Sequence, residues 1–100
     1  RPTCIFYPDD FASIGGIEVL SENKINFGKD ISIAGYDGTM LAGLIKPKLA
    51  TYEQNAKEIG RNIAVQLINQ IENPSTFEPS VITVGGRLLE GESIAAYSEK

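Results

Sequence analysis

The chain has 100 residues, of which 42% are hydrophobic, and 13 Asp and Glu against 9 Lys and Arg give it a net charge of −4. This composition suits one small globular domain with a core of its own, and the acidic balance argues against a surface that binds nucleic-acid phosphates. A single cysteine, Cys4, and the absence of histidine exclude an internal disulfide, His-ligated or cysteine-cluster metal sites, and Ser-His-Asp or Cys-His catalysis.

The start of the chain is strand-like at once. It opens with Arg1-Pro2 rather than Met, and we interpret it as a piece of a longer polypeptide. Residues 3–7 form a short apolar run that predicts a strand buried on both faces, with Cys4 in the core. Asp9 or Asp10 then supplies a helix N-cap, and the helix extends to about Glu22.

The predicted helix has two apolar faces. One stripe should lie on the sheet and consists of Ala12, Gly15, Gly16, Val19 and Leu20. Ile14 points the opposite way, among Ser13, Glu18 and Ser21. Its face is either a solvent-exposed surface with a few apolar side chains or a surface buried against another chain.

The remaining elements alternate between strand and helix. A second strand is predicted at residues 31–36, a helical turn at 39–45, a third strand at 49–52 and a strongly amphipathic helix at 55–72, followed by strands at 80–84 and 87–89. This order predicts an α/β fold with a mostly parallel sheet. No apolar run approaches the length of roughly 18 residues that spans a bilayer.

Acidic residues follow the first two predicted strands. Asp9 comes after the first strand and Asp37 after the second, so both should emerge at the same edge of a parallel sheet. A pair of carboxylates at that edge suits the vicinal hydroxyls of a sugar or another polyol. Phe11, close to Asp9 in sequence, could stack on the apolar side of a sugar ring.

Other interpretations of these residues stay open. Asp9 could serve only as a helix cap, and Asp37 only as part of an Asp-Gly turn with Gly38. A third interpretation is a magnesium site, as in receiver domains. Because no nucleophile and base can be paired in this sequence, we expect binding rather than catalysis.

Several stretches carry a family resemblance and follow one another in register. They are Pro2-Thr3-Cys4-Ile5-Phe6, Asp9-Asp10, Ala12-Ser13-Ile14-Gly15-Gly16, Asp30-Ile31-Ser32-Ile33-Ala34-Gly35-Tyr36-Asp37, Pro47-Lys48-Leu49-Ala50-Thr51, Gln54, Gly60 and Glu92-Ser93. Together they cover nearly the whole chain, which resembles the LacI/GalR family of bacterial transcription regulators.

The resemblance implies a Rossmann-like fragment of the two-lobed periplasmic-binding-protein-like I fold, from the C-terminal part of the effector-binding domain. Residues 1–50 then belong to the C-terminal lobe. Residues 51–78 cross the hinge and supply a helix of the N-terminal lobe, and residues 79–100 return to the C-terminal lobe and form the tail. The DNA-binding domain of the family lies upstream of this sequence.

The resemblance also implies a function and site residues. The chain would be the effector-sensing, sugar-binding part of a cytoplasmic repressor that acts as a homodimer and contacts DNA only through the upstream domain. Asp9, Phe11 and Asp37 match positions that bind the effector, and Ile14 and Ile45 match positions at the dimer interface. No membrane contact, enzymatic activity, metal or cofactor is expected.

Some residues depart from the family pattern. Asp9 stands where sugar-responsive members have Asn, which removes a hydrogen-bond donor and adds negative charge, so the hydroxyl pattern or charge of the effector is expected to differ. Gly38 and Gly28 replace an Asp and a Pro. The alternatives are a periplasmic sugar-binding protein of a transporter, a magnesium-binding receiver-like domain, and an effector domain on a GntR-type DNA-binding head.

The helix at residues 55–72 leads to a separate expectation. Its apolar stripe needs cover, because each fully buried large apolar side chain contributes about 1.5–3 kcal/mol. We therefore expect the isolated 100 residues to self-associate or to pack this helix on the remaining sheet.

Overall fold

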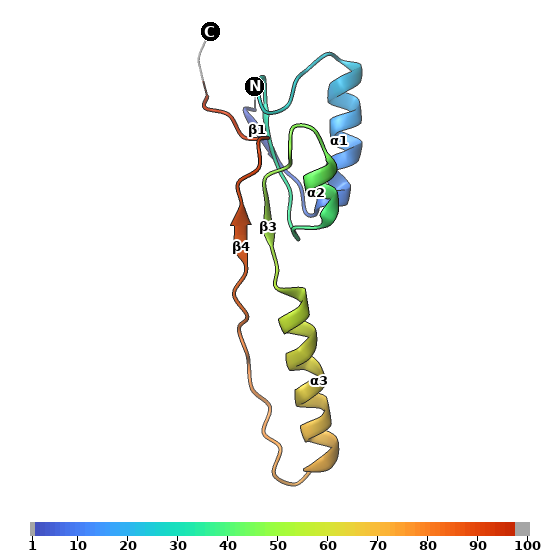
Figure 1. The fold of residues 1–100 in the computed structure, drawn as a ribbon, viewed down its shortest axis with the longest axis vertical. Helices are drawn as coiled ribbons and strands as arrows, with labels where there is room; N and C mark the ends of the chain where they lie inside the picture. Colours follow the sequence, from blue (N-terminus) through green and yellow to red (C-terminus); the bar gives the residue numbers. More distant parts are fainter. Residues whose placement is uncertain (1, 98–100) are drawn as a thin grey trace. The chain divides into compact units, whose positions relative to one another are not determined.

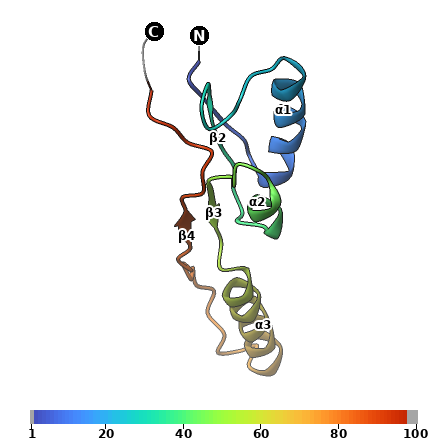
Figure 2. The ribbon, with the colours of Figure 1, turned by 45° about the horizontal axis from the view of Figure 1, so that its top comes forward.

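The computed structural model describes residues 2–97 (Figures 1 and 2). The elements, in chain order, are β1 (Cys4–Phe6), α1 (Asp10–Glu22), β2 (Ser32–Ala34), α2 (Met40–Leu44), β3 (Thr51–Glu53), α3 (Ala56–Glu72) and β4 (Arg87–Leu89). They form two compact units: the sheet unit, which ends at Glu53 and resumes at Arg87, and the helix unit, Gln54–Gly86. The assignment of segments to lobes stays a prediction, and residues 98–100 of the expected tail lie outside the described residues.

The sheet unit confirms the predicted α/β architecture. β1 and β2 are parallel, with Ile5 opposite Ile33, and α1 connects them. Parallel bridges join Ala34 to Ala50 and Asp37 to Glu53, so the segment that contains β3 lies parallel to β2. β4 is antiparallel to β3. Figures 1 and 2 show α1 and α2 on one side of the strands, where the two helices contact each other.

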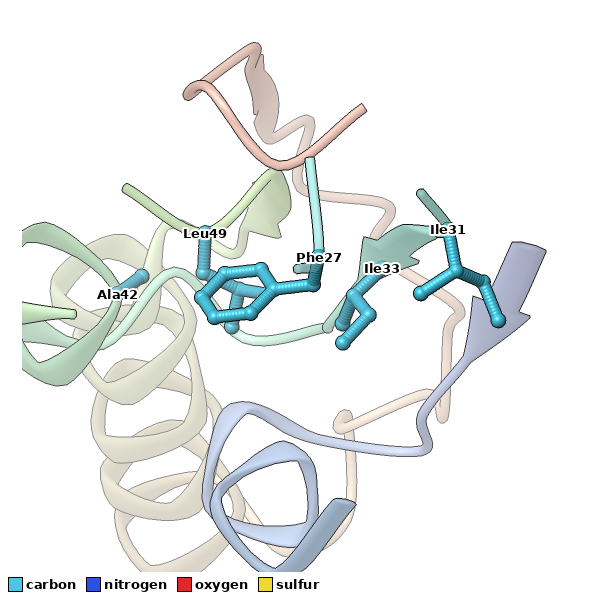
Figure 3. Packing of buried hydrophobic residues seen from close by; sticks show 5 residues of the cluster. All are labelled: Phe27, Ile31, Ile33, Ala42 and Leu49. Carbon is cyan, nitrogen blue, oxygen red and sulfur yellow. The ribbon is translucent and has the colours of Figure 1, made fainter. Parts of the chain in front are cut away.

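The core of the sheet unit lies between the strands and these helices (Figure 3). Ile33 of β2 is completely buried, and Leu49 is 2% exposed. The buried cluster consists of Phe27, Ile31, Ile33, Ala42 and Leu49. Ile17 and Leu20 of α1 pack against it. One face of α1 therefore covers the buried cluster to which Ile33 of β2 belongs.

A buried serine joins three segments of the sheet unit. The Ser93 hydroxyl donates to the Ile33 carbonyl at 2.5 Å and accepts from the Ala50 N–H at 2.8 Å. In a regular parallel pair, the Ala50 N–H would donate directly to the Ile33 carbonyl, because the Gly35 N–H already donates to the Ala50 carbonyl at 2.8 Å. The Ser93 hydroxyl thus replaces one direct backbone hydrogen bond between β2 and the segment that leads into β3, and bridges its donor and acceptor.

The prediction that the first strand is buried on both faces is wrong for the described residues. Cys4 is exposed and Phe6 is 70% exposed, whereas Ile5 and Tyr7 pack against the core. Side chains alternate between the two faces of a strand, so one face of β1 meets the core and the other faces outward. The expected core position of Cys4 is therefore corrected to a surface position.

The predicted inner face of α1 is also partly wrong. Ser13, expected on the outer face, is completely buried, while Val19, expected on the inner face, is 56% exposed. Gly16 does lie inward, since a Cβ atom there would clash with the Tyr7 hydroxyl. The inner face of α1 therefore contains Asp10, Ser13 and Gly16 instead of Val19, and the buried hydrogen bond from the Thr51 hydroxyl to Asp10 joins this face to β3.

The predicted strand at residues 80–84 does not form, although the structure describes all five residues. Only the following segment, β4, pairs, and its partner is β3. A strand requires a neighbour for its backbone N–H and C=O groups, and the described part of the helix unit provides a helix and no strand for this purpose. Val81 is consequently 95% exposed.

In the helix unit, α3 begins at the predicted cap. The Asn55 side chain accepts from the Glu58 N–H at 3.3 Å. All of α3 is described and none of its residues is buried: Ile63, Leu67 and Ile71 are 63%, 55% and 68% exposed. Ile63 and Leu67 line a groove of about 520 Å³ together with Phe77, Ile82 and Val84 of the returning segment. The predicted apolar stripe therefore exists, and within the described residues it is left largely exposed.

Within residues 2–97, no helix combines the length and the apolar character that a membrane span requires.

Candidate functional site

The two predicted ligand residues lie at the same edge of the sheet unit. Asp9 follows the end of β1 by three residues, and Asp37 follows the end of β2 by three residues. Beyond the strands the two segments stay connected, because the Asp10 N–H donates to the Tyr36 carbonyl at 3.0 Å. The parallel bridge from Asp37 brings Glu53 to this edge as well. We call the edge that carries Asp9, Asp37 and Glu53 the rim.

Asp9 is the N-cap of α1. One carboxylate oxygen accepts from the Ala12 N–H at 2.7 Å, and the residue is half-buried. The negative charge at this helix end also interacts favourably with the helix dipole. A capping role is therefore established by the geometry. It engages Oδ1, and a carboxylate has a second oxygen that can accept hydrogen bonds.

Asp10, the other candidate cap, has a different role. It is completely buried, and its Oδ1 accepts from the Thr51 hydroxyl at 2.7 Å. Its Oδ2 accepts from the Thr39 N–H at 2.7 Å and from the Thr39 hydroxyl at 2.8 Å. The carboxylate thus joins the first turn of α1 to the segment before α2 and to the first residue of β3.

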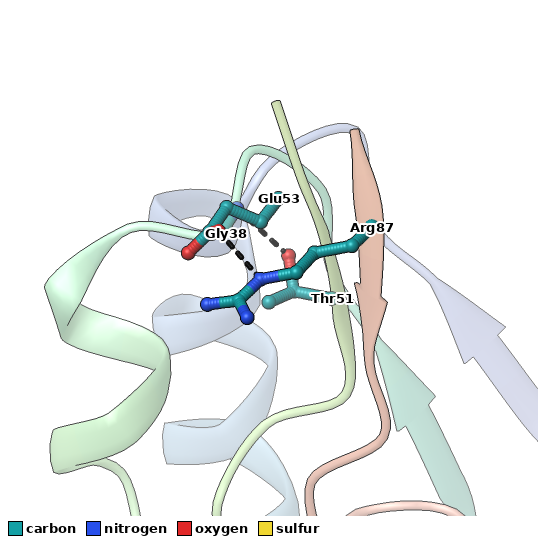
Figure 4. Close-up of polar contacts among 4 residues, drawn as sticks. All are labelled: Gly38, Thr51, Glu53 and Arg87. Carbon is teal, nitrogen blue, oxygen red and sulfur yellow. Dashed lines mark hydrogen bonds and ion pairs between the residues drawn. The ribbon is translucent and has the colours of Figure 1, made fainter. Parts of the chain in front are cut away.

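Asp37 and Gly38 form a turn with unusual backbone geometry. Asp37 has φ 103° and Gly38 has φ 67°, and residues other than glycine rarely adopt positive φ. The Asp37 N–H donates to the Tyr52 carbonyl at 3.0 Å. The Gly38 N–H donates to the Thr51 hydroxyl at 3.1 Å (Figure 4). We call the Asp37-Gly38 segment the turn, and these two hydrogen bonds hold Asp37 at the rim.

Glu53 adds a charge pair to the rim that the sequence analysis did not identify. Its Oε1 lies 2.8 Å from Nε of Arg87, on the neighbouring antiparallel strand (Figure 4). The Arg87 side chain is 72% exposed, so this ion pair contributes little to stability. Glu53 is the last residue of β3, and Asp37 follows the end of β2. A search for acidic residues at the carboxyl ends of parallel strands, which selected Asp37, therefore also identifies Glu53.

The aromatic residues near the rim differ in exposure. Phe11, in the first turn of α1, is 68% exposed. Tyr36 and Tyr52 stack on each other, with ring centroids 5.8 Å apart and an interplanar angle of 16°. Tyr7 lies against Gly16. Of these rings, Phe11 therefore presents the most accessible face.

The two predicted dimer positions also differ. Ile14 on α1 is 41% exposed, as an interface position requires in an isolated chain. Ile45, the C-cap of α2, is half-buried and packs against the core. Leu44, next to it, is 68% exposed. The apolar surface at the end of α2 therefore comes more from Leu44 than from Ile45.

The described part of the chain brings no three His, Cys, Asp or Glu side chains close enough to hold a metal ion. The sequence pointed to Asp10 only as a possible helix cap and assigned no role at the rim to Thr39 or Thr51. Thr51 lies in a predicted strand, and a hydroxyl that faces the core needs a buried polar partner, so the sequence indicated that such a partner exists. No sequence signal identified Asp10 as the partner.

Transcription regulators are among the known proteins to which this chain is similar. A family model for the periplasmic binding protein-like domain matches residues 1–94. The ribose operon repressor of Haemophilus influenzae is 32% identical over 75 residues, which cover 75% of this chain and 23% of that protein. The HTH-type transcriptional repressor PurR of Escherichia fergusonii is 33% identical over 95 residues, which cover 95% of this chain and 28% of that protein.

The fold comparison agrees. The crystal structure of a LacI family transcriptional regulator from Enterococcus faecium, with bound ribose, is 30% identical and superimposes with a TM-score of 0.88. The match covers 96% of this chain and 35% of that chain. This chain therefore spans about a quarter to a third of the proteins that it matches. It belongs to the periplasmic-binding-protein-like family, in the form that LacI/GalR-type transcription regulators carry.

Proposed function

We propose that this chain is the C-terminal part of the effector-sensing domain of a LacI/GalR-type repressor, and that its rim binds a sugar. The observation that carries the proposal is that Asp9 and Asp37 each follow a parallel strand by three residues and are tied together by the backbone beyond the strands. Ligands of open α/β sheets bind beyond the carboxyl ends of the strands.

Each of the three predicted ligand residues has a defined part in this proposal. Asp37, held by its turn, accepts hydrogen bonds from the sugar hydroxyls. Asp9 contributes Oδ2, since Oδ1 caps α1. Phe11 covers an apolar face of the ring, as its exposure allows. The ribose operon repressor and the ribose-bound regulator support a sugar as the ligand class.

The test uses the intact protein and a titration with D-ribose, followed by other pentoses and hexoses. Asp37→Ala is expected to weaken the affinity by about 100-fold or more, because each hydrogen bond to a charged group contributes about 1.5–3 kcal/mol. Glu22→Ala is the matched control, since it removes an exposed carboxylate from the other end of α1. Wild-type affinity in Asp37→Ala would refute the site.

Asp9→Asn separates capping from ligand binding. Asparagine caps helices as well as aspartate does, so the stability of the protein is expected to fall only by the lost interaction with the helix dipole, about 0.3–1 kcal/mol. The added donor and the lost charge should instead change which sugar binds best. A variant with the same ranking of sugars and the same affinities as the wild type would exclude Asp9 from the site.

We further propose that Ile14 and Ile45 lie at the interface of a homodimer, with Leu44 contributing more surface than Ile45. The support is the exposed apolar surface on α1 and α2, two helices that contact each other. Ile14→Asp is expected to raise the dimer dissociation constant in sedimentation of the intact protein. Val19→Asp is the control, because Val19 is exposed on the same helix but lies about 140° around its axis. Equal effects of both changes would contradict the assignment.

The repressor acts, in this proposal, through a ligand-dependent shift of two lobes that the dimer transmits to upstream DNA-binding domains. The relatives with which this chain shares about a third of its residues are repressors, which favours a regulator over the binding protein of a transporter. A gel-shift measurement on the intact protein, with and without the sugar, tests this step. Absence of any specific DNA fragment bound would favour the transporter alternative.

A further inference from the structure

Asp10 is a completely buried carboxylate that cannot contact a ligand. It accepts three hydrogen bonds, all between 2.7 and 2.8 Å, from Thr39 and Thr51. Its Oδ1 also lies close to Gly35, the residue that follows β2, since a Cβ atom on Gly35 would come within 2.5 Å of it. The carboxylate therefore fits tightly between α1 and the segment that follows β2.

The partners of Asp10 contact the turn at Asp37 and Gly38 in two ways: Thr39 follows it in the chain, and Thr51 lies on the neighbouring strand β3. Thr39 directly follows the turn, and both its N–H and its hydroxyl donate to Asp10. Thr51 donates its hydroxyl proton to Asp10 and accepts from the Gly38 N–H at 3.1 Å (Figure 4). Through these two threonines, a single carboxylate fixes the backbone of Gly38 and of Thr39.

The turn needs such support. Asp37 adopts φ 103°, a conformation that is disfavoured for a residue with a Cβ atom and that persists only when its surroundings hold it. On the other side, the Tyr52 carbonyl holds the Asp37 N–H at 3.0 Å. Gly38 also packs directly on β3, where a Cβ atom would clash with the backbone of Glu53.

We propose that Asp10 is a positioning residue for effector binding: it sets the direction of the Asp37 carboxylate by anchoring the following two residues through Thr39 and Thr51. The proposal rests on the proposed function, in which Asp37 binds the sugar. Asp10 supplies acceptors only, and its three partners are donors. An amide in its place would keep the shape but direct an NH₂ group at one of these donors.

The first readout is hydrogen exchange at the turn, measured by mass spectrometry on the intact protein without ligand. Thr51→Val removes the hydroxyl at nearly constant volume, and Thr51→Ser retains it. Exchange at Gly38 and Thr39 is expected to rise about tenfold or more in Thr51→Val and Asp10→Asn. It should return to near the wild-type rate in Thr51→Ser.

The second readout is the dissociation constant for D-ribose, or for the sugar of the pentose and hexose series that binds the wild type best. It is expected to rise about tenfold or more in Thr51→Val and Asp10→Asn, and to recover in Thr51→Ser. Ser13→Ala is the control, since the Ser13 hydroxyl donates to the Asp10 carbonyl and not to its carboxylate. This control should leave both readouts unchanged.

The outcomes separate the inference from the proposed function. Faster exchange with unchanged sugar affinity, or equal effects of Thr51→Ser and Thr51→Val, would overturn the positioning role. A wild type that binds no sugar of the series would refute the proposed function. In that case hydrogen exchange alone tests the anchoring role of Asp10. Faster exchange at the turn in Thr51→Val, with near wild-type exchange in Thr51→Ser, supports this role, and unchanged exchange in Thr51→Val overturns it. Should Asp10→Asn fail to fold, the two Thr51 variants carry the test.

Discussion

Replacing Ser93 with alanine would remove one oxygen atom from the middle of the sheet unit. That hydroxyl donates to the Ile33 carbonyl and accepts from the Ala50 N–H, and Ser93 is completely buried. Ser93→Ala breaks two hydrogen bonds that each contribute about 0.5–1.5 kcal/mol, and it leaves a buried donor without a partner at a cost of about 1–3 kcal/mol. We expect a loss of about 2–4 kcal/mol in the free energy of opening this part of the sheet.

Ser13→Ala is the matched comparison, because Ser13 is also completely buried and also loses one hydroxyl. Its hydroxyl donates to the Asp10 carbonyl at 2.5 Å, within the same helix. In a helix this carbonyl can still accept from the backbone N–H four residues later, so the variant leaves no buried group without a partner there. Alanine is also the stronger helix former. The loss expected for Ser13→Ala is therefore about 1 kcal/mol or less.

The assay is hydrogen exchange of the intact protein, read on peptides that contain Ala50. Local opening controls exchange in such a segment, so a loss of 2–4 kcal/mol corresponds to acceleration by about 30-fold or more in Ser93→Ala. Ser13→Ala should change this rate by less than about tenfold. If Ala50 exchanges no faster in Ser93→Ala than in Ser13→Ala, the Ala50 N–H has closed directly onto Ile33, and the reasoning about the inserted hydroxyl is refuted.

Two further predictions concern a glycine and α3. Gly38→Ala is expected to cost at least about 2 kcal/mol, since φ is 67° and the Cβ atom would meet the backbone of Glu53. Gly43→Ala, with nothing within 4 Å, should be neutral or slightly stabilising, and thermal unfolding of the intact protein compares the two. The isolated 100 residues should self-associate in sedimentation, because α3 leaves its apolar stripe uncovered. A monomer with fast exchange throughout α3 would contradict this.

The local elements were predictable because each has a strong signal of its own. The cap at Asp9, the turn at Asp37 and Gly38 and the cap at Asn55 use residue types with specific backbone preferences. The parallel pairing of β1 and β2 follows from the strand–helix–strand order. Residues 80–84 also have a strong strand signal, but pairing depends on a neighbour, which a propensity does not supply.

The sequence alone determined the alternation of strands and helices, the caps and turns between them, and the edge at which Asp9 and Asp37 emerge, since all of these follow from local chemistry and from the handedness of parallel connections. The rotation of α1, the exposure of Cys4 and the burial of Asp10 became evident only from the packed structure. These depend on partners distant in sequence: Asp10 meets Thr39 and Thr51 only when β2 and β3 stand side by side. A carboxylate is buried where such donors converge, and no pattern within α1 reveals that they do.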